Sequence, residues 1–283
     1  MSTTASVNFR TEFEALVKQV YQMGSRLDGT TRVRENANAK TVRFPKLGKG
    51  IATPRIPQAE VTLMNLEHSY VDVTLTDWDA SELAAIEDLD KLAFDERTEI
   101  MKAVLMAIGR RRDQFIIDAM ALSANTTQVG EDVGATDSSL NIDKILRAKR
   151  LMDDAGVPEN DRYMAVTARA IEAGLALTQI GSADYNSVRA LAMGQLNTFA
   201  GFKFIMIESR SGEGGLPLVA AEPNKRNCFA WHKDAVGLAL TGGIRPSTDW
   251  IPMRKSWLVT AGITGGGVTI DTDGVYDVLL YEA

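Results

Sequence analysis

The side chains that most often build catalytic and metal sites are scarce in this chain of 283 residues, which has one cysteine, Cys228, and two histidines, His68 and His232. A zinc site would need three or four soft or imidazole ligands. Cys228 and His232 are expected on the same side of a strand, so a site is conceivable. A buried thiol and a strand-end imidazole are the simpler interpretation, and the sequence predicts no metal.

Nucleophilic catalysis has equally little support. No Gly-x-Ser-x-Gly turn is present, and a Ser-His-acid triad would have to use His68 or His232, neither of which lies in a supporting motif. The paired carboxylates Asp153 and Asp154 stand at the end of a predicted helix, where solvation explains them. These observations argue against an enzyme.

Loops that bind phosphate or calcium are missing or incomplete. The chain has no P-loop, and the glycines at 48–50 and 212–214 lack the third glycine of a dinucleotide fingerprint, so we expect them in turns. Asp271-x-Asp273-Gly274 matches only the start of a calcium loop, and a β-turn is the simpler interpretation. No cofactor is therefore expected.

Composition describes a globular chain with a weakly acidic surface. The 31 Lys and Arg against 37 Asp and Glu give a net charge of −6 and a pI near 5.1, which argues against a generally basic nucleic-acid-binding surface. The longest conspicuous apolar run, Ala103 to Ile108, is far shorter than the roughly 20 residues of a membrane span. We expect no membrane partner.

A long helix is the clearest element that could position other parts. Residues 95–123 have helical spacing, with Asp95 as the N-cap and Glu96 and Glu99 in the first turn. About 29 residues at 1.5 Å each span roughly 43 Å. The triplet Arg110–Arg112 interrupts the apolar stripe and indicates an exposed face or a partner-binding surface. The residues expected to pack on C-terminal strands include Ile100, Val104, Ile108 and Phe115.

Other elements flank this helix. Residues 9–23 predict an amphipathic N-terminal arm, and the aperiodic stretch 32–55 followed by the alternating stretch 61–76 predicts a long hairpin loop. An α/β subdomain of about 100 residues follows. Its elements are a helix from an Asn141 cap to Gly156, a strand at 162–167, a helix at 168–178, and strands at 201–208 and 228–231. Near the C-terminus, 268–270 and 275–281 are expected to pair as a hairpin through the turn at 271–274.

This order of elements resembles the major capsid proteins of tailed bacteriophages, which have the Hong Kong 97-like fold. ERTEIMKAVLMAIGRRRDQFIIDAM is similar to their spine helix, LMDDAGVPENDRYMAVTARAIEAGL to the opening of their axial domain, and GQLNTFAGFKFIMIES to the turn into its central strand. The resemblance covers nearly the whole chain and implies an α+β fold. The parts that it implies are an N-terminal arm (1–31), an extended loop (32–76), a peripheral domain with the spine helix (77–140), an axial domain (141–240) and closing peripheral strands (241–283).

The resemblance implies a structural subunit rather than an enzyme. Such a subunit self-assembles through hexamers and pentamers into the icosahedral shell of a virion, is assembled in the cytoplasm of a bacterial host, and encloses phage double-stranded DNA by non-specific proximity. A portal and a separate scaffolding protein are the expected partners, and a decoration protein is a further candidate. The alternatives are an encapsulin-like nanocompartment shell and a hydrolase with an unrecognised α/β site.

Charge adds one expectation about assembly. The stretch from Arg32 to Arg55 has a balance of +6, and the stretch from Asp77 to Glu99 has a balance of −7. Because the extended loop of this family reaches over a neighbouring subunit, we expect the two stretches to meet between subunits; two solvated surfaces are the competing interpretation. The contact candidates are Arg43, Lys46 and Lys49 on the basic side, and Glu87, Asp88 and Asp90 on the acidic side.

Overall fold

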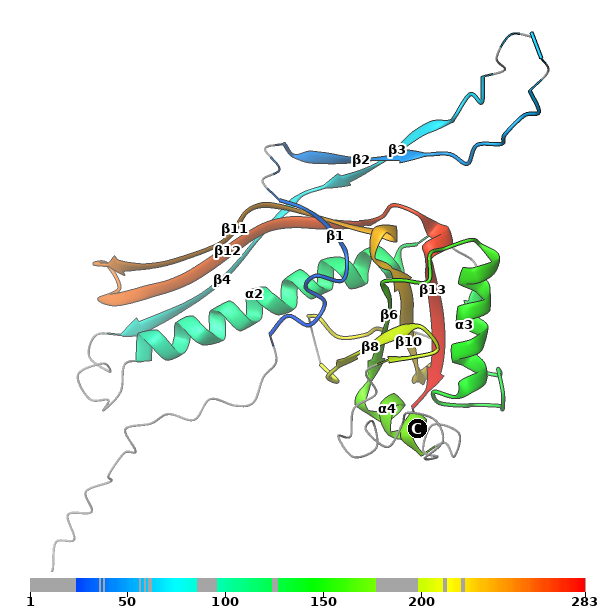
Figure 1. Ribbon diagram of the computed structural model, residues 1–283. Helices are drawn as coiled ribbons and strands as arrows, with labels where there is room; N and C mark the ends of the chain where they lie inside the picture. Colours follow the sequence, from blue (N-terminus) through cyan, green and yellow to red (C-terminus); the bar gives the residue numbers. More distant parts are fainter. Residues whose placement is uncertain are drawn as a thin grey trace, which may run out of the picture.

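The computed structural model describes residues 24–35, 37, 39–55, 57–58, 60, 63–85, 96–123, 127–176, 198–210, 213–219 and 222–282. The amphipathic arm predicted for residues 9–23 lies outside these ranges. The described chain forms two sheets with their helices and a hairpin that projects away from both (Figure 1).

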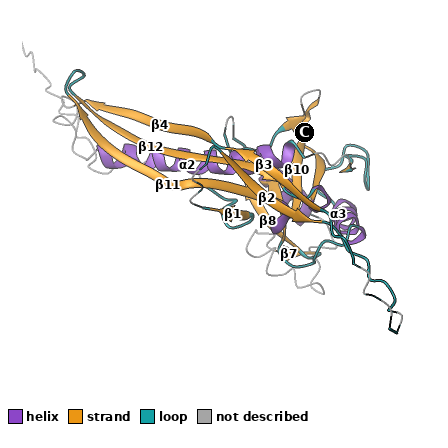
Figure 2. Cartoon of the chain, turned by 90° about the horizontal axis from the view of Figure 1, so that it is seen from above, coloured by secondary structure: helices purple, strands orange, loops and turns teal. Residues whose placement is uncertain are grey.

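One half of the subunit is a four-stranded sheet with the long helix α2 (Glu96–Ala121) along it (Figure 1, Figure 2). β12 is antiparallel to β11 and β4, and β1 is parallel to β11. The 26 residues of α2 rise about 39 Å, which confirms the predicted long helix; its Asp95 cap lies outside the described residues. In sheet order the strands are β1 (Arg32–Arg34), β11 (Val236–Ile251), β12 (Ser256–Thr269) and β4 (Thr76–Ala85).

Glycines let α2 lie very close to β12. A Cβ added to Gly265 would be 3.0 Å from the Phe115 ring, and one added to Gly267 would be 2.2 Å from the Phe115 carbonyl oxygen. Gly266, between them, faces the other side of the sheet, where its Cβ would be 2.6 Å from the Thr74 carbonyl oxygen. The buried residues of α2 include Val104, Ile108, Phe115 and Ala119. The predicted packing of the helix on C-terminal strands is confirmed.

The other half is a seven-stranded sheet accompanied by α3 (Ile142–Asp154) and α4 (Ala168–Leu175). Asn141 caps α3 by accepting a hydrogen bond from the Lys144 backbone N–H at 2.8 Å, as predicted. β9 (Leu218–Val219) pairs with β10 beside the main path. In sheet order the strands are β5 (Gln128–Val129), β13 (Val275–Tyr281), β10 (Glu222–His232), β6 (Arg162–Thr167), β8 (Phe202–Ile207) and β7 (Thr198–Phe199).

The predicted C-terminal hairpin is wrong. β12 stays in the four-stranded sheet, while β13 enters the other sheet between β10 and β5. Residues 272–274 form a short 3₁₀ turn that carries the chain from one sheet to the other. The turn predicted at 271–274 does form. The pairing is different because β13 is a largely buried strand that pairs along both edges with strands from distant parts of the chain.

The projecting hairpin consists of β2 (Thr41–Leu47) and β3 (His68–Thr74), which pair antiparallel. The long hairpin predicted from the sequence is confirmed, although its strands are shorter than the alternating stretch 61–76. Its base packs on β11 and β12, and its distal part extends beyond α3 (Figure 1). Within the described ranges, no helix combines the length and apolar character needed to cross a bilayer.

Candidate interaction surfaces

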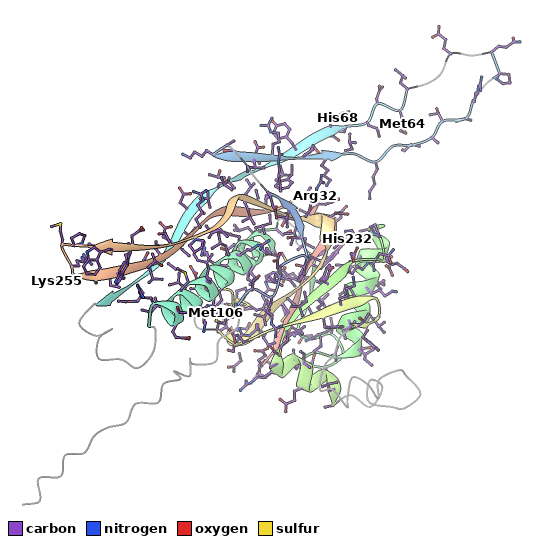
Figure 3. All side chains as sticks on the ribbon, turned by 60° about the vertical axis from the view of Figure 1, so that its left-hand side comes forward. Arg32, Met64, His68, Met106, His232 and Lys255 are labelled. Carbon is purple, nitrogen blue, oxygen red and sulfur yellow. The ribbon has the colours of Figure 1, made fainter. Side chains whose placement is uncertain are left out.

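The cysteine and the histidines do not form a reactive site. Cys228 is fully buried, and burial raises the pKa of its thiol. His232 lies four residues further along the same strand, which separates the two Cα atoms by about 13 Å, and its Nδ1 accepts from the Asp234 N–H. His68 is exposed on the hairpin, away from His232 (Figure 3). In the part of the chain that the structure describes, no group of three or more metal-ligating side chains comes together.

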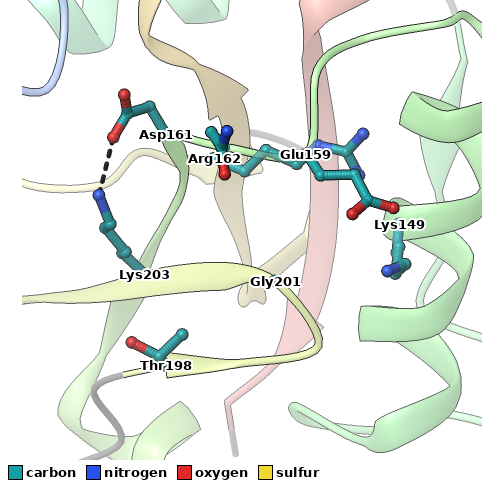
Figure 4. A pocket seen from close by; sticks show the side chains of 8 residues that line it. Lys149, Glu159, Asp161, Arg162, Thr198, Gly201 and Lys203 are labelled. Carbon is teal, nitrogen blue, oxygen red and sulfur yellow. Dashed lines mark hydrogen bonds and ion pairs between the residues drawn. The ribbon is translucent and has the colours of Figure 1, made fainter.

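A polar pocket of about 520 Å³ opens between α3, the start of β6 and the turn from β7 to β8 (Figure 4). Lys203 Nζ pairs with Asp161 at 2.8 Å, and buried Arg162 pairs with Asp153 at 2.7 Å while donating to two backbone carbonyls. Thr198 is the only hydroxyl among the lining residues, and no imidazole accompanies it. The pocket suits polar contacts rather than nucleophilic chemistry. It is lined by Lys149, Glu159, Asn160, Asp161, Arg162, Thr198, Gly201 and Lys203.

Buried charged groups around the seven-stranded sheet stabilise its packing. Lys144 is fully buried; its ammonium donates to the carbonyls of Ser138 and Leu279, and burial lowers its pKa to about 8. The Arg226 guanidinium pairs with the Glu282 carboxylate at 2.7 Å, and Thr167 donates to the same carboxylate. These contacts join the 131–140 loop and the C-terminal strand to the sheet.

The arginine triplet of α2 is less exposed than the sequence suggested. The Arg111 guanidinium lies 3.4 Å above the Trp78 ring and 3.1 Å from Glu213, and Arg112 pairs with Asp28 at 2.8 Å. Only 14% and 18% of these two side chains are exposed. The open face predicted for Arg111 and Arg112 is therefore wrong, because each guanidinium finds a carboxylate from a distant segment of its own chain.

Of the six predicted contact residues, the structure describes the basic three, and all of them have a partner within the chain. Arg43 forms two hydrogen bonds with Asp72, at 2.8 and 3.0 Å, and lies 3.6 Å above the Tyr70 ring. Lys46 pairs with Asp271 at 2.8 Å, and Lys49 donates to the Ala155 carbonyl at 3.4 Å. Glu87, Asp88 and Asp90 lie outside the described residues. Their contact with a neighbouring basic loop stays a prediction.

The base of the hairpin is buried, which the sequence reasoning missed. Phe44 and Val73 are 2% and 5% exposed and pack against Ala239 and Ile270. Close approach is possible because a Cβ on Gly237 would already be 3.0 Å from Phe44. The alternation of buried and exposed residues in β2 was the available signal. The hairpin therefore leaves the body in a fixed direction.

Beyond this base the hairpin exposes large apolar side chains. Met64 and Leu47 are 51% and 59% exposed. Ile51 and Leu63 reach 82% and 76%. Isolated monomers rarely expose such a group of residues. This distal surface is typical of one that is covered in an assembly.

A second apolar surface lies at the opposite end of the molecule, at the tip of β11 and β12 (Figure 2). Met253 in the turn is 97% exposed, and the rings of Trp250 and Trp257 meet at 5.4 Å. On the outer face an open pocket of about 500 Å³ is lined by Ser81, Glu82, Leu83, Ile251, Arg254 and Leu258. Figure 3 shows Lys255 at this tip and Met64 on the hairpin at the far end. The subunit thus presents two separate surfaces suited to binding other chains.

A comparison with protein-family models agrees with a subunit that binds other chains at two surfaces. A family model described as phage capsid protein matches residues 5–282. This chain belongs to the phage capsid protein family. The capsid protein has no significant match among curated protein sequences. The family match favours the phage shell over the nanocompartment shell that the sequence left as an alternative.

Solved structures show that the capsid fold extends over the whole chain. The head structure of Helicobacter pylori bacteriophage KHP40 has a TM-score of 0.78 at 12% identity, covering 99% of this chain and 98% of that one. The capsid of Cyanophage P-SCSP1u has a TM-score of 0.74 at 16% sequence identity, covering 98% of this chain and 94% of that one. The structure of Mycobacterium phage Che8 has a TM-score of 0.72 at 15% sequence identity, covering 97% of this chain and 98% of that one. At these identities the likeness establishes the fold alone, and it confirms the predicted α+β, Hong Kong 97-like architecture.

The capsid protein is therefore the structural subunit that forms the shell of a virion. Its two exposed apolar surfaces lie at opposite ends of the subunit, on the β2–β3 hairpin and at the tip of β11 and β12 (Figure 1). A subunit with different surfaces at its two ends makes head-to-tail contacts, which close into rings or shells when the rotation between copies permits. Shell formation accounts for surfaces that would be a liability in a monomer.

Proposed function

We propose that this capsid protein assembles into hexamers and pentamers that close an icosahedral shell around phage double-stranded DNA, in the cytoplasm of a bacterial host and without enzymatic activity. A portal and a separate scaffolding protein are proposed partners, and a decoration protein is a further candidate. The observation that carries the proposal is the pair of exposed apolar surfaces at opposite ends of a subunit with the capsid fold.

Electron microscopy of the expressed full chain tests the proposal. Concentrated protein, alone or with a co-expressed scaffold, is expected to form capsomers, tubes or shells. Strictly monomeric protein under both conditions would contradict it. Shells purified with a cargo enzyme instead of nucleic acid would favour the nanocompartment alternative.

The family's parts are proposed with the limits expected from the sequence: an arm (1–31), an extended loop (32–76), a peripheral domain (77–140 and 241–283) and an axial domain (141–240). The position of β4 and α2 in one sheet-and-helix layer supports the peripheral assignment. β11 begins at Val236, and β13 pairs with β10, so the closing segment contributes to both sheets.

We propose that the hairpin of one subunit covers the acidic stretch of the next, as the charge map predicts. Besides Glu87, Asp88 and Asp90, the acidic stretch includes residues that the structure describes. Asp77 and Asp79 are exposed along β4, an edge strand of its sheet. Exposed ion pairs contribute only about 0–1 kcal/mol each, but a shell repeats them in every subunit. Salt should weaken these contacts.

Charge reversal tests this contact. Replacing Lys46 and Lys49 with Glu should impair assembly, and adding Glu87→Lys and Asp88→Lys in the same chain should partly restore it. Asp271→Asn is the matched control, because it neutralises the carboxylate that pairs with Lys46 within the chain, keeps Lys46 and Lys49 basic, and retains an oxygen that can accept from the Asp273 N–H. Normal assembly of the doubly reversed loop variant at low salt would rule out the pairing.

A further inference from the structure

Residues 24–31, here named the arm root, cross α2 at a buried carboxylate. Asp113 is 0% exposed. Its Oδ1 accepts hydrogen bonds from Ser25 Oγ at 2.7 Å and from the Leu27 N–H at 3.1 Å, and its Oδ2 accepts from the Arg26 N–H at 2.9 Å. Three donors from consecutive residues therefore converge on one side chain of the helix.

The other half of the subunit contributes a buried arginine to the same place. Arg210, in the loop after β8, has a side chain that is 6% exposed. Its guanidinium lies 3.8 Å from Asp113 Oδ2, donates to the Gly24 carbonyl at 3.1 Å and pairs with Glu208 at 2.6 Å. The arm root is thus held between α2 and a loop of the seven-stranded sheet.

Further contacts seat the arm root along its length. Leu27 is fully buried, and the Thr30 carbonyl accepts from the Trp231 indole N–H at 3.0 Å. On the helix, Gly109 leaves room for the crossing, since a Cβ there would lie 2.9 Å from the Ser25 nitrogen. These contacts fix the position of the arm root where it crosses α2.

The packing of α2 does not by itself explain why position 113 is a carboxylate. Burial disfavours a charged group, and desolvation raises the pKa of Asp113 against the hydrogen bonds from Ser25, Arg26 and Leu27 that lower it. An apolar side chain would fill the same space without that cost. A carboxylate that binds two successive backbone N–H groups fixes the direction of the chain as well as its position, as an N-cap does at a helix start.

We propose that Asp113 and Arg210 form a clasp that sets the point and direction at which residues 1–23 leave the subunit, and that shells close correctly only when this clasp holds. The proposal rests on the shell-forming function. The direction of the chain at Gly24 decides which neighbouring copy the residues before it approach. Asp113 and Arg210 are positioning residues in this role.

Two variants of the full-length protein test the clasp by different means. Asp113→Asn keeps the shape but places an amide N–H against donors of the arm root or of Arg210. Gly109→Ala favours the helix but pushes Ser25 out of its slot. Glu99→Gln is the matched control, since it changes a carboxylate on α2 that pairs with Lys102 at the surface, about four helical turns from Asp113.

Hydrogen–deuterium exchange and electron microscopy provide separate readouts. In both variants the amides of Arg26 and Leu27 should exchange about tenfold faster or more, while β13 stays protected. The same variants should give open, irregular or no particles, and Glu99→Gln should match the wild type in both measurements. If Asp113→Asn fails to fold, Gly109→Ala decides.

Unchanged exchange at Arg26 and Leu27 in Gly109→Ala would overturn the clasp. Regular closed shells despite fast exchange would overturn its role in assembly. If the wild type and Glu99→Gln also form no shells, the shell-forming function itself fails and takes the assembly role with it, while the exchange data still decide whether the clasp exists.

Discussion

Gly267→Ala measures how much stability depends on the close packing of α2 on β12. Gly267 is not among the glycines with positive φ, so alanine suits the backbone and the effect comes from space alone. A Cβ would lie 2.2 Å from the Phe115 carbonyl oxygen, whereas ordinary contacts begin at 3.4 Å. The helix or the strand would have to move by about 1.2 Å in a region packed like a crystal.

The expected loss of stability is about 2 kcal/mol. Overpacking a core costs about 1–3 kcal/mol, and a contact with a backbone oxygen, which no rotamer change relieves, belongs at the upper end. The lower entropy of the unfolded alanine chain offsets about 0.4–1 kcal/mol of this cost.

Urea unfolding of unassembled subunits, followed by tryptophan fluorescence, gives the midpoint and the slope. Gly267→Ala should lower the midpoint at unchanged slope. Gly130→Ala is the matched control, because a Cβ there has nothing within 4 Å. Gly266→Ala should instead push Thr74, at the base of the hairpin, away from β12 and impair assembly more than stability. Equal midpoints for Gly267→Ala and Gly130→Ala would refute the packing argument.

Three further outcomes are expected. Phe115→Ala should cost about 3–5 kcal/mol and reduce soluble yield, because the ring is 4% exposed; wild-type yield and unfolding midpoint would contradict this. The unfolding free energy should rise between about pH 8 and pH 10.5, because folded Lys144, whose pKa is lowered from 10.5 to about 8, releases its proton before the unfolded chain does; Lys144→Met should lack that rise in urea titrations, and an unaltered profile would show that another group is responsible. Leu258→Asp, in the open pocket of the tip, should keep its thermal midpoint but lose shells in electron micrographs; normal shells would exclude the tip from assembly.

Elements that depend on local signals were predictable. The spacing of apolar residues in α2, the Asn141 cap of α3 and the strand at β6 all act within a few residues, and each is where the sequence placed it. The pairing of β13 was not, because the partner of a strand depends on which distant segments bury its two faces. Local turn residues therefore gave a false hairpin.

The charged side chains show the same limit. Arg111, Lys46 and Asp113 have partners that are 102, 225 and 88 residues away along the chain, and charge patterns read along a sequence do not report such pairs. A carboxylate among the buried residues of α2, between Ile108 and Phe115, was the one available sign that this helix binds a polar segment. The sequence alone does not show which segment binds Asp113.

The pairing of early strands with late ones determines when the subunit can fold during its synthesis. β1 pairs with β11, β4 pairs with β12, and Thr269 donates to the Ala119 carbonyl 150 residues earlier. At about 5–20 residues per second, a ribosome needs roughly 8–30 s to make that intervening chain. During this interval the apolar face of α2 has no sheet to cover it. We therefore expect the nascent subunit to be prone to aggregation until β11 and β12 have been synthesised.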